Sequence, residues 1–151
     1  MKPVIVRGGG DLATATIHRL CKSGYPVIIL ECERPSAIRR LVSFCQAVYE
    51  GTMEVEGLTC SRAESFEQAL DQVSWNHPQL IVDPRGKCLE HYHPDVLVDG
   101  ILAKENLGTR RDMAELTIAL GPGFTAGEDV DYVIETKRGH YLGRIISQGA
   151  A

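Results

Sequence analysis

The chain begins with a β-branched run, three consecutive glycines and an amphipathic helical pattern, and this order constrains the fold more than any other feature. Residues 4–6 (VIV) predict a short buried strand, and residues 8–10 are all glycine. Asp11 opens a helix that places four apolar residues on one face: Ala13, Ile17, Leu20 and Cys21. Gly24 is a typical helix stop, and a second strand over residues 27–30 ends at Glu31. The opening therefore predicts a parallel β-α-β unit.

Residues 8–13 (GGGDLA) fit G-x-G-x-x-A, the alanine form of the dinucleotide-binding fingerprint. Gly8 would make the tight turn, Gly10 would let the main chain approach a pyrophosphate, and Ala13 would let the helix pack closely on the sheet. The carboxylate of Glu31 would accept hydrogen bonds from ribose hydroxyls, which favours NAD over NADP. The candidate ligand-binding residues here are Gly8, Gly9, Gly10, Asp11, Ala13 and Glu31.

A purely structural interpretation of the same loop stays open. Asp11 lies at the helix start, where its carboxylate can cap the free N–H groups that a phosphate would use and would also repel that phosphate. The glycines would then serve only the geometry of the turn, and Glu31 would be a solvated strand end.

The remaining pattern predicts an α/β fold. A helix is expected from Pro35-Ser36 until Gly51 ends it, with an apolar stripe from Ile38 to Tyr49. A strand over residues 55–60 and a helix over residues 65–73 capped by S-x-x-Q follow. Residues 80–82, 96–98 and 116–120 predict buried strands, and residues 132–136 and 141–146 predict an antiparallel hairpin. Together they predict one domain over residues 1–151: a Rossmann-like three-layer fold, with a mostly parallel sheet and a C-terminal antiparallel hairpin.

A second cluster of loops is expected at the carboxyl edge of this sheet, where open α/β sheets bind ligands. Residues 95–109 (DVLVDGILAKENLGT) supply a cation, an amide and a hydroxyl in Lys104, Asn106 and Thr109. The GPGF sequence at 121–124 follows the next strand, so Gly121 and Gly123 could face the same crevice. The alternative is that Lys104 and Glu105 form a solvated pair and that both loops are plain turns.

No set of residues predicts a catalytic or metal site. Asp99, Lys104 and His140 are the available proton donors or acceptors, and none has an evident partner. The Cys88-x-x-His91-x-His93 sequence lacks an evident fourth ligand and matches no common zinc spacing, so no metal is predicted. The five cysteines are odd in number and contain no C-x-x-C pair, which is typical of reduced thiols in a cytosolic protein.

Charge and hydropathy exclude other classes of partner. The net charge of −4 gives no electrostatic case for binding nucleic acid or an acidic membrane. No apolar run approaches the length of a bilayer span, and Arg7 interrupts the first apolar run too early for a signal peptide. We therefore expect a cytoplasmic protein, while its state as monomer or homo-oligomer stays open.

Four stretches together resemble the selenium-dependent molybdenum hydroxylase system protein family, which is akin to the xanthine dehydrogenase accessory factors with a Rossmann-like domain. They are RGGGDLAT, PSAIRRLVSFCQAVYEG, DVLVDGILAKENLGT and ALGPGFTAGEDVDYVIETKRGHYLGR. The resemblance runs over most of the chain. It implies a role in maturing or supporting a molybdenum hydroxylase, without naming a reaction.

The chain departs from the family pattern in two respects. Ala15 stands where glycine is expected after GGGDLAT, and family members usually continue past the hairpin. The chain is thus either the first part of a longer protein or a shorter version.

Three functions are compatible with these observations. The first is an accessory protein that binds NAD or another nucleotide-type ligand through its glycine loop. The second is an NAD-dependent oxidoreductase of a small substrate, and the third is a non-catalytic module that docks a partner.

Overall fold

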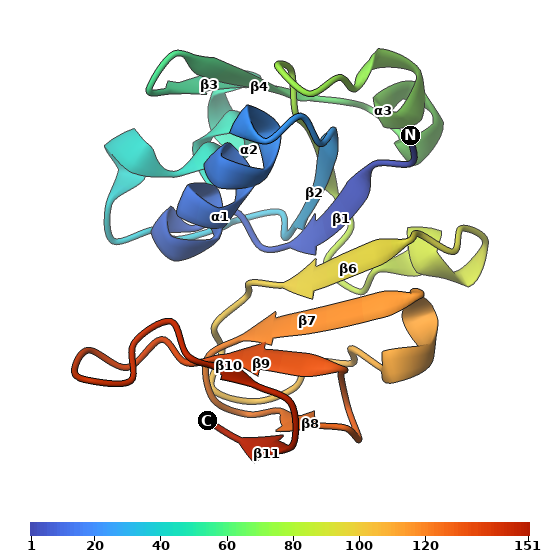
Figure 1. Ribbon diagram of the computed structural model, residues 1–151. Coiled ribbons are helices and arrows are strands. Elements are labelled where there is room, and N and C mark those ends of the chain that lie inside the picture. Colours follow the sequence, from blue (N-terminus) through green and yellow to red (C-terminus); the bar gives the residue numbers. More distant parts are fainter.

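The computed structural model describes residues 1–151, and its main feature is a nine-stranded sheet in the order β10-β9-β7-β6-β1-β2-β5-β4-β3 (Figure 1). Its strands are β1 (Val4–Arg7), β2 (Val27–Glu31), β3 (Thr52–Val55), β4 (Leu58–Arg62), β5 (Gln79–Val82), β6 (Val96–Asp99), β7 (Leu116–Leu120), β9 (Tyr132–Ile134) and β10 (Ile145–Ile146). The short strands β8 (Thr125–Ala126) and β11 (Gly149–Ala150) form a separate antiparallel pair.

The seven central strands, from β9 to β4, are parallel to their neighbours, and an antiparallel strand closes each edge of the sheet. The chain starts at β1 in the middle of the sheet and continues through β2 to β5 on one side. It then returns to pair β6 with the other side of β1, where Arg7 lies opposite Asp99. The direction of winding therefore reverses between β1 and β6. Because the strands are parallel, the loops that follow them all leave from one edge, towards which the central arrowheads point in Figure 1.

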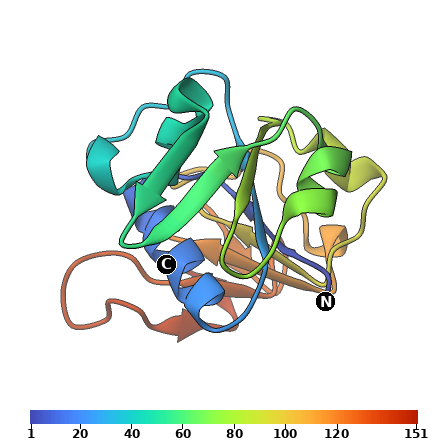
Figure 2. The same cartoon turned by 90° about the horizontal axis from the view of Figure 1, so that it is seen from above.

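Apolar side chains cover both faces of the sheet. One face packs against α1 (Asp11–Lys22), the 3₁₀ turn η2 (Phe44–Gln46) and α2 (Ala47–Glu50), with η1 (Arg40–Val42) beside them. The other face packs against α3 (Phe66–Gln72) and the 3₁₀ turns η3 (Lys87–Glu90) and η4 (Arg111–Met113). Figure 2 shows α1 in blue and α3 in green on opposite sides of the sheet. The fold is thus a mixed α/β fold with a large, mostly parallel sheet.

Several sequence-based expectations are confirmed. The opening strand–helix–strand unit is present, with β1 and β2 adjacent and parallel. Ser65 caps α3, because its side chain accepts a hydrogen bond from the main-chain N–H of Gln68 at 3.1 Å. The C-terminal hairpin is also present as β9 and β10, although its paired segments are shorter than expected.

The prediction of one helix from Pro35-Ser36 up to Gly51 was wrong. This segment forms only η1, η2 and the four-residue α2. Two hydrogen bonds draw its middle onto the glycine loop: Cys45 N–H donates to the carbonyl of Gly9 at 2.9 Å, and Phe44 N–H donates to the hydroxyl of Thr14 at 2.9 Å. Phe44 and Cys45 are consequently buried, whereas Ile38 and Leu41 of the expected stripe are 97% and 87% exposed.

The strand expected over residues 55–60 was also wrong in its bounds. The chain instead makes an antiparallel hairpin of β3 and β4 that turns at Glu56 and Gly57, both at positive φ. The reason is local, since Gly57 supplies the backbone freedom of a tight turn in the middle of the segment that was expected to be one strand. None of the helices has the length and apolar character needed to cross a lipid bilayer.

Candidate functional site

The glycine loop holds β1, β6 and α1 in close contact. Gly8 has φ +94°, and a Cβ at this position would lie 2.8 Å from the carbonyl oxygen of Gly100, just after β6. A Cβ on Gly100 would in turn lie 3.0 Å from the Cβ of Ala13 in α1. Gly8 and Ala13 therefore occupy positions where only a small residue allows two strands and a helix to meet, as the fingerprint predicts.

The second and third glycines have different surroundings. The N–H of Gly9 donates to Oε2 of Glu31 at 2.8 Å, and a Cβ there would lie 3.2 Å from the main-chain nitrogen of Cys45. Gly10 is the N-cap of α1, and a Cβ there would meet no atom within 4 Å. The N–H groups of Gly10 and Asp11 form no hydrogen bond within the chain. The loop thus presents two free main-chain donors and an open side at the start of a twelve-residue helix.

Two carboxylates border these donors. Glu31 ends β2, and its oxygens accept hydrogen bonds from the N–H groups of Gly9 and Cys32, both at 2.8 Å. Each oxygen retains a second lone pair that can accept a further donor. Asp11 accepts the N–H of Leu12 at 3.0 Å, so it satisfies one donor of the first turn, as the structural interpretation expected. Its other oxygen lies 3.9 Å from Nε of Arg39, which offsets part of its negative charge.

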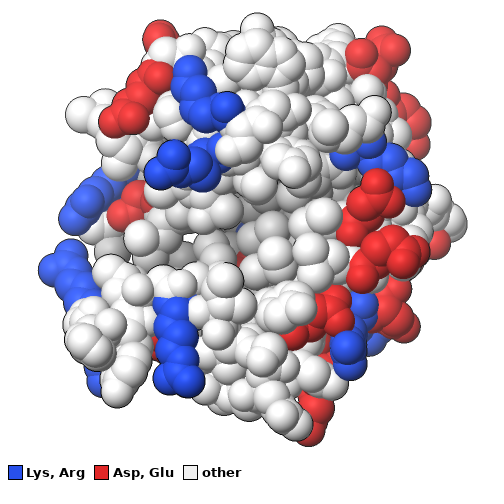
Figure 3. All heavy atoms as spheres, viewed as in Figure 1, with Lys and Arg blue, Asp and Glu red and all other residues white.

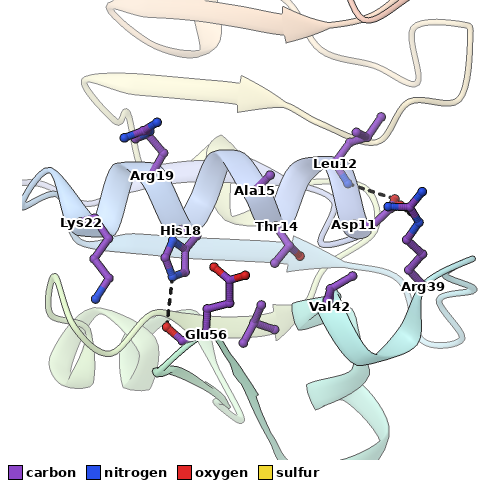
Figure 4. Close-up of a pocket in the computed structure, with 11 residues that line it drawn as sticks. Asp11, Leu12, Thr14, Ala15, His18, Arg19, Lys22, Arg39, Val42 and Glu56 are labelled. Carbon is purple, nitrogen blue, oxygen red and sulfur yellow. Dashed lines mark hydrogen bonds and ion pairs between the residues drawn. The ribbon is translucent and has the colours of Figure 1, made fainter. Parts of the chain in front are cut away.

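A groove of about 500 Å³ begins at this helix start and follows the solvent side of α1. Figure 4 shows it between α1, the segment that carries Arg39 and Val42, and the β3–β4 turn at Glu56. His18 Nε2 lies 3.3 Å from the carbonyl oxygen of Glu56, so this side chain spans the groove from α1 to the β3–β4 turn. Leu12 and Val42 contribute apolar surface beside Arg39, so the groove is amphipathic and adjoins the two free donors.

The second loop cluster lies next to the glycine loop, and its two segments pack on each other. A Cβ on Gly123 would lie 2.7 Å from the main chain of Glu105, and a Cβ on Gly121 would lie 2.9 Å from the side chain of Leu102. Leu102 and Lys104 both have positive φ, at +59° and +64°. Residues other than glycine rarely hold such conformations unless their surroundings impose them. Gly121 and Gly123 therefore shape the loop that carries Lys104, whose side chain is exposed.

Thr109 and Asn106 have internal partners. The buried guanidinium of Arg7 donates to the hydroxyl of Thr109 at 2.9 Å, and this hydroxyl donates to Oδ2 of Asp99 at 2.6 Å. Arg7 also donates to the carbonyl oxygens of Pro84 at 3.1 Å and Leu107 at 3.3 Å. Asn106 accepts the N–H of Thr109 and donates to its carbonyl, both at 2.8 Å, which fixes the turn. The side chains of Thr109 and Asn106 therefore hold the loop after β6 in its conformation through contacts within the chain.

The reactive side chains considered earlier are dispersed. Asp99 is 1% exposed, and its Oδ1 accepts the N–H of Ile101 at 3.1 Å, so both of its oxygens have partners. His140 lies on the exposed loop between β9 and β10. His93 lies 3.2 Å from Glu115. No three His, Cys, Asp or Glu side chains are grouped so that they could hold a metal ion.

The cysteines are free, and none has the lowered pKa of a nucleophile. Burial, with the charge of Glu31, raises the pKa of Cys32 and raises that of Cys45 to about 11. Burial, with a hydrogen bond to Asp83, also raises the pKa of Cys88 to about 12.

Arg7 is the residue of this edge that the sequence did not single out. The sequence pattern suggests only the polar end of a strand, yet Arg7 is 2% exposed and its guanidinium donates to three groups in two loops. Thr14 was likewise missed, although its hydroxyl donates to Gly9 at 3.1 Å and accepts from Phe44. The only available signal was indirect: a charged residue directly after three apolar strand positions must be paired if the strand is central.

One curated relative gives context. The chain is 50% identical over 148 residues to the uncharacterized protein YqeB of Escherichia coli strain K12, and this match covers 98% of the chain. It covers only 27% of YqeB, so the chain spans about a quarter of the length of that relative. No protein-family model matches the chain. No solved structure matches it either.

Proposed function

We propose that this chain binds a nucleotide-type ligand at the edge of the sheet where β1 and β6 end. The observation that carries the proposal is the pair of free N–H groups of Gly10 and Asp11 at the start of α1, beside the open side of Gly10. Main-chain donors at a helix N-terminus carry partial positive charge and suit a phosphate group.

The topology supports the same location. Without the β3–β4 hairpin, the sheet order β5-β2-β1-β6-β7-β9 corresponds to the strand order of doubly wound dinucleotide-binding sheets. In such sheets the ligand crevice lies outside the carboxyl ends of the strands where the winding reverses, here between β1 and β6. These features support a Rossmann-like arrangement with the phosphate at Gly10.

The neighbouring side chains indicate the rest of the ligand. Glu31 lies at the end of β2, where a carboxylate accepts ribose hydroxyls, and its negative charge disfavours the extra phosphate of NADP. Arg39 lies at the mouth of the groove along α1 and offers a guanidinium to a phosphate. We infer NAD or a related nucleotide as the ligand class. The cellular setting, support of molybdenum hydroxylase maturation, rests on the resemblance of the sequence motifs.

The test is a calorimetric titration of the purified chain with NAD, NADP and a pterin nucleotide, repeated with Gly10→Val. Gly10 has φ −69° and open space around its Cβ position, so valine fits the fold and obstructs only the approach of a ligand. Gln72→Val is the control, because it places the same side chain at an exposed position of α3, on the opposite face of the sheet and outside the groove.

We expect Gly10→Val to weaken nucleotide binding by about tenfold or more, and Gln72→Val to leave it unchanged. Negligible binding by the wild-type chain, or equal binding by the wild type and Gly10→Val, would contradict the proposal. A docking module with an unused loop predicts a different result. It would capture a molybdenum hydroxylase subunit equally well with and without Gly10→Val.

A further inference from the structure

The loop between β9 and β10, residues 135–144, forms an arm that stands out from the molecule. In Figures 1 and 2 the arm projects on the left, on the side to which the parallel strands point. Because β9 is parallel to β7, the arm leaves the sheet at the same edge as the glycine loop. Its base contacts the second loop cluster, since a Cβ on Gly121 would lie 3.0 Å from Oγ1 of Thr136.

The arm has defined internal structure. Main-chain hydrogen bonds extend the hairpin into it: Glu135 N–H donates to Arg144 at 2.9 Å, and Gly143 N–H donates to Glu135 at 2.8 Å. Two side chains lie beside the ring of Tyr141. The guanidinium of Arg144 is 5.6 Å from the ring centre, and the centres of the His140 and Tyr141 rings are 5.2 Å apart. The arm therefore presents an aromatic face and cations together.

The charge of the arm is opposite to that of the whole chain. It carries Lys137, Arg138 and Arg144 with a single acid, Glu135, in a chain whose net charge is −4. None of the three cations forms an ion pair within the chain. In Figure 3 Lys and Arg side chains gather on the left of the molecule, above and below a hollow. Unpaired arginines beside an aromatic ring are suited to phosphate groups and to the flat rings attached to them.

The arm also encloses space. A hollow of about 360 Å³ lies between the arm and residues near the C-terminus. Its charged lining residues are the three cations Lys137, Arg138 and Arg144 and one acid, Glu135, beside His140 and Tyr141. Small-molecule sites occupy roughly 300–1,000 Å³, so the hollow admits a phosphorylated small molecule. A hollow of this size favours a small molecule over a nucleic acid strand, which would need an extended basic groove.

We propose that the arm is a second anion-binding element at this edge and that it binds phosphate groups, through Arg138 and Arg144, with Tyr141 beside them. The inference rests on the proposed function for the identity of the ligand as a nucleotide. It adds that recognition requires a phosphorylated ligand, because a bare nucleoside would leave these cations without a partner.

The experiment uses inorganic pyrophosphate as its probe, titrated by calorimetry into the full chain. The test variant is Arg138→Ser/Arg144→Ser. Arg85→Ser/Lys87→Ser is the control, since it removes the same charge from exposed positions after β5 that line neither the groove along α1 nor the hollow of the arm. Both pairs are exposed, so we expect native circular dichroism for each variant. The dissociation constant for pyrophosphate is expected to rise about tenfold or more in the arm variant and to stay unchanged in the control.

The outcomes separate the two proposals. Absence of pyrophosphate binding by the wild type, or equal loss in both double variants, overturns the arm site. Equal nucleotide binding by the wild type and Gly10→Val overturns the site at the glycine loop, whatever pyrophosphate does at the arm. An arm variant that keeps pyrophosphate binding but loses binding of a single-stranded oligonucleotide would assign the arm to nucleic acid and would also overturn this inference.

Discussion

Gly8 and Gly24 provide an internal comparison of what a close contact between main chains contributes to this fold. Both residues have φ +94°, a conformation that side chains other than glycine rarely adopt. A Cβ on Gly24 would meet no atom within 4 Å, whereas one on Gly8 would lie 2.8 Å from the carbonyl oxygen of Gly100. Substitution of each by alanine therefore introduces similar backbone strain but only one collision.

The expected losses of stability follow from these two contributions. Alanine in a left-handed conformation costs about 1–2 kcal/mol, and this is the whole expected effect of Gly24→Ala. Gly8→Ala adds a collision with the main chain of a neighbouring strand. That collision must lengthen the 2.8 Å hydrogen bond between Gly100 N–H and the carbonyl of Arg7. Overpacking of this kind costs about 1–3 kcal/mol more, so we expect Gly8→Ala to lose about 2–5 kcal/mol.

Urea denaturation followed by circular dichroism measures both variants under the same conditions. With a slope near 2 kcal/mol per M, the midpoint is expected to fall by about 0.5–1 M for Gly24→Ala and by about 1–2.5 M for Gly8→Ala. Equal shifts for the two variants would refute the reasoning, because the contact with Gly100 would then contribute nothing. If Gly8→Ala does not fold at all, its refolding on addition of an osmolyte provides the same comparison.

Three further predictions concern buried groups. Thr109→Val is nearly isosteric but removes the hydroxyl that lies between the buried charges of Arg7 and Asp99. We therefore expect its free energy of unfolding to fall by about 3 kcal/mol. Thr109→Ser keeps the hydroxyl and is expected to lose only about 1 kcal/mol. Burial alone would raise the pKa of Asp131, but hydrogen bonds from Thr117 and Arg111 outweigh it and hold this pKa below its ordinary value of 3.8. Because the pKa is lower in the folded state, the resulting stabilisation is complete above pH 3.8 and is lost at lower pH. The difference in unfolding free energy between the wild type and Asp131→Asn should therefore shrink below pH 3.8. A difference that stays constant with pH would contradict this prediction. Burial raises the pKa of Cys60, so a thiol reagent at pH 8 is expected to modify this residue only after unfolding, and labelling at the rate of a free thiol would disprove its burial.

Local patterns predicted the parts of the fold that local interactions determine. The β-branched run of residues 4–6 forms the buried strand that was predicted. Gly8 makes the turn after it at positive φ, and Ala13 packs closely on Gly100, as the fingerprint expects. That Gly10 lets a pyrophosphate approach stays a prediction. The cap of α3 at Ser65 likewise depends on residues within one turn.

Tertiary hydrogen bonds explain what the sequence could not predict. The apolar spacing of residues 38–49 is that of a helix, but Gly9 and Thr14 bind the main chain of Cys45 and Phe44 from 30 or more residues away. Those bonds replace the helical bonds that the middle of the segment would have made with itself. Arg7 was missed for the same reason, since its partners Thr109 and Pro84 lie far along the chain. Whether the free N–H groups of Gly10 and Asp11 receive a ligand stays a prediction.

The contacts of Arg7 have a thermodynamic consequence for any molecule that binds at this edge of the sheet. One guanidinium joins the loop after β5 to the loop after β6, and Thr109 connects it to Asp99. These loops lose their conformational freedom when the chain folds, so a ligand does not have to order them on arrival. We therefore expect association with a small entropic penalty and loops of the same shape with and without a ligand.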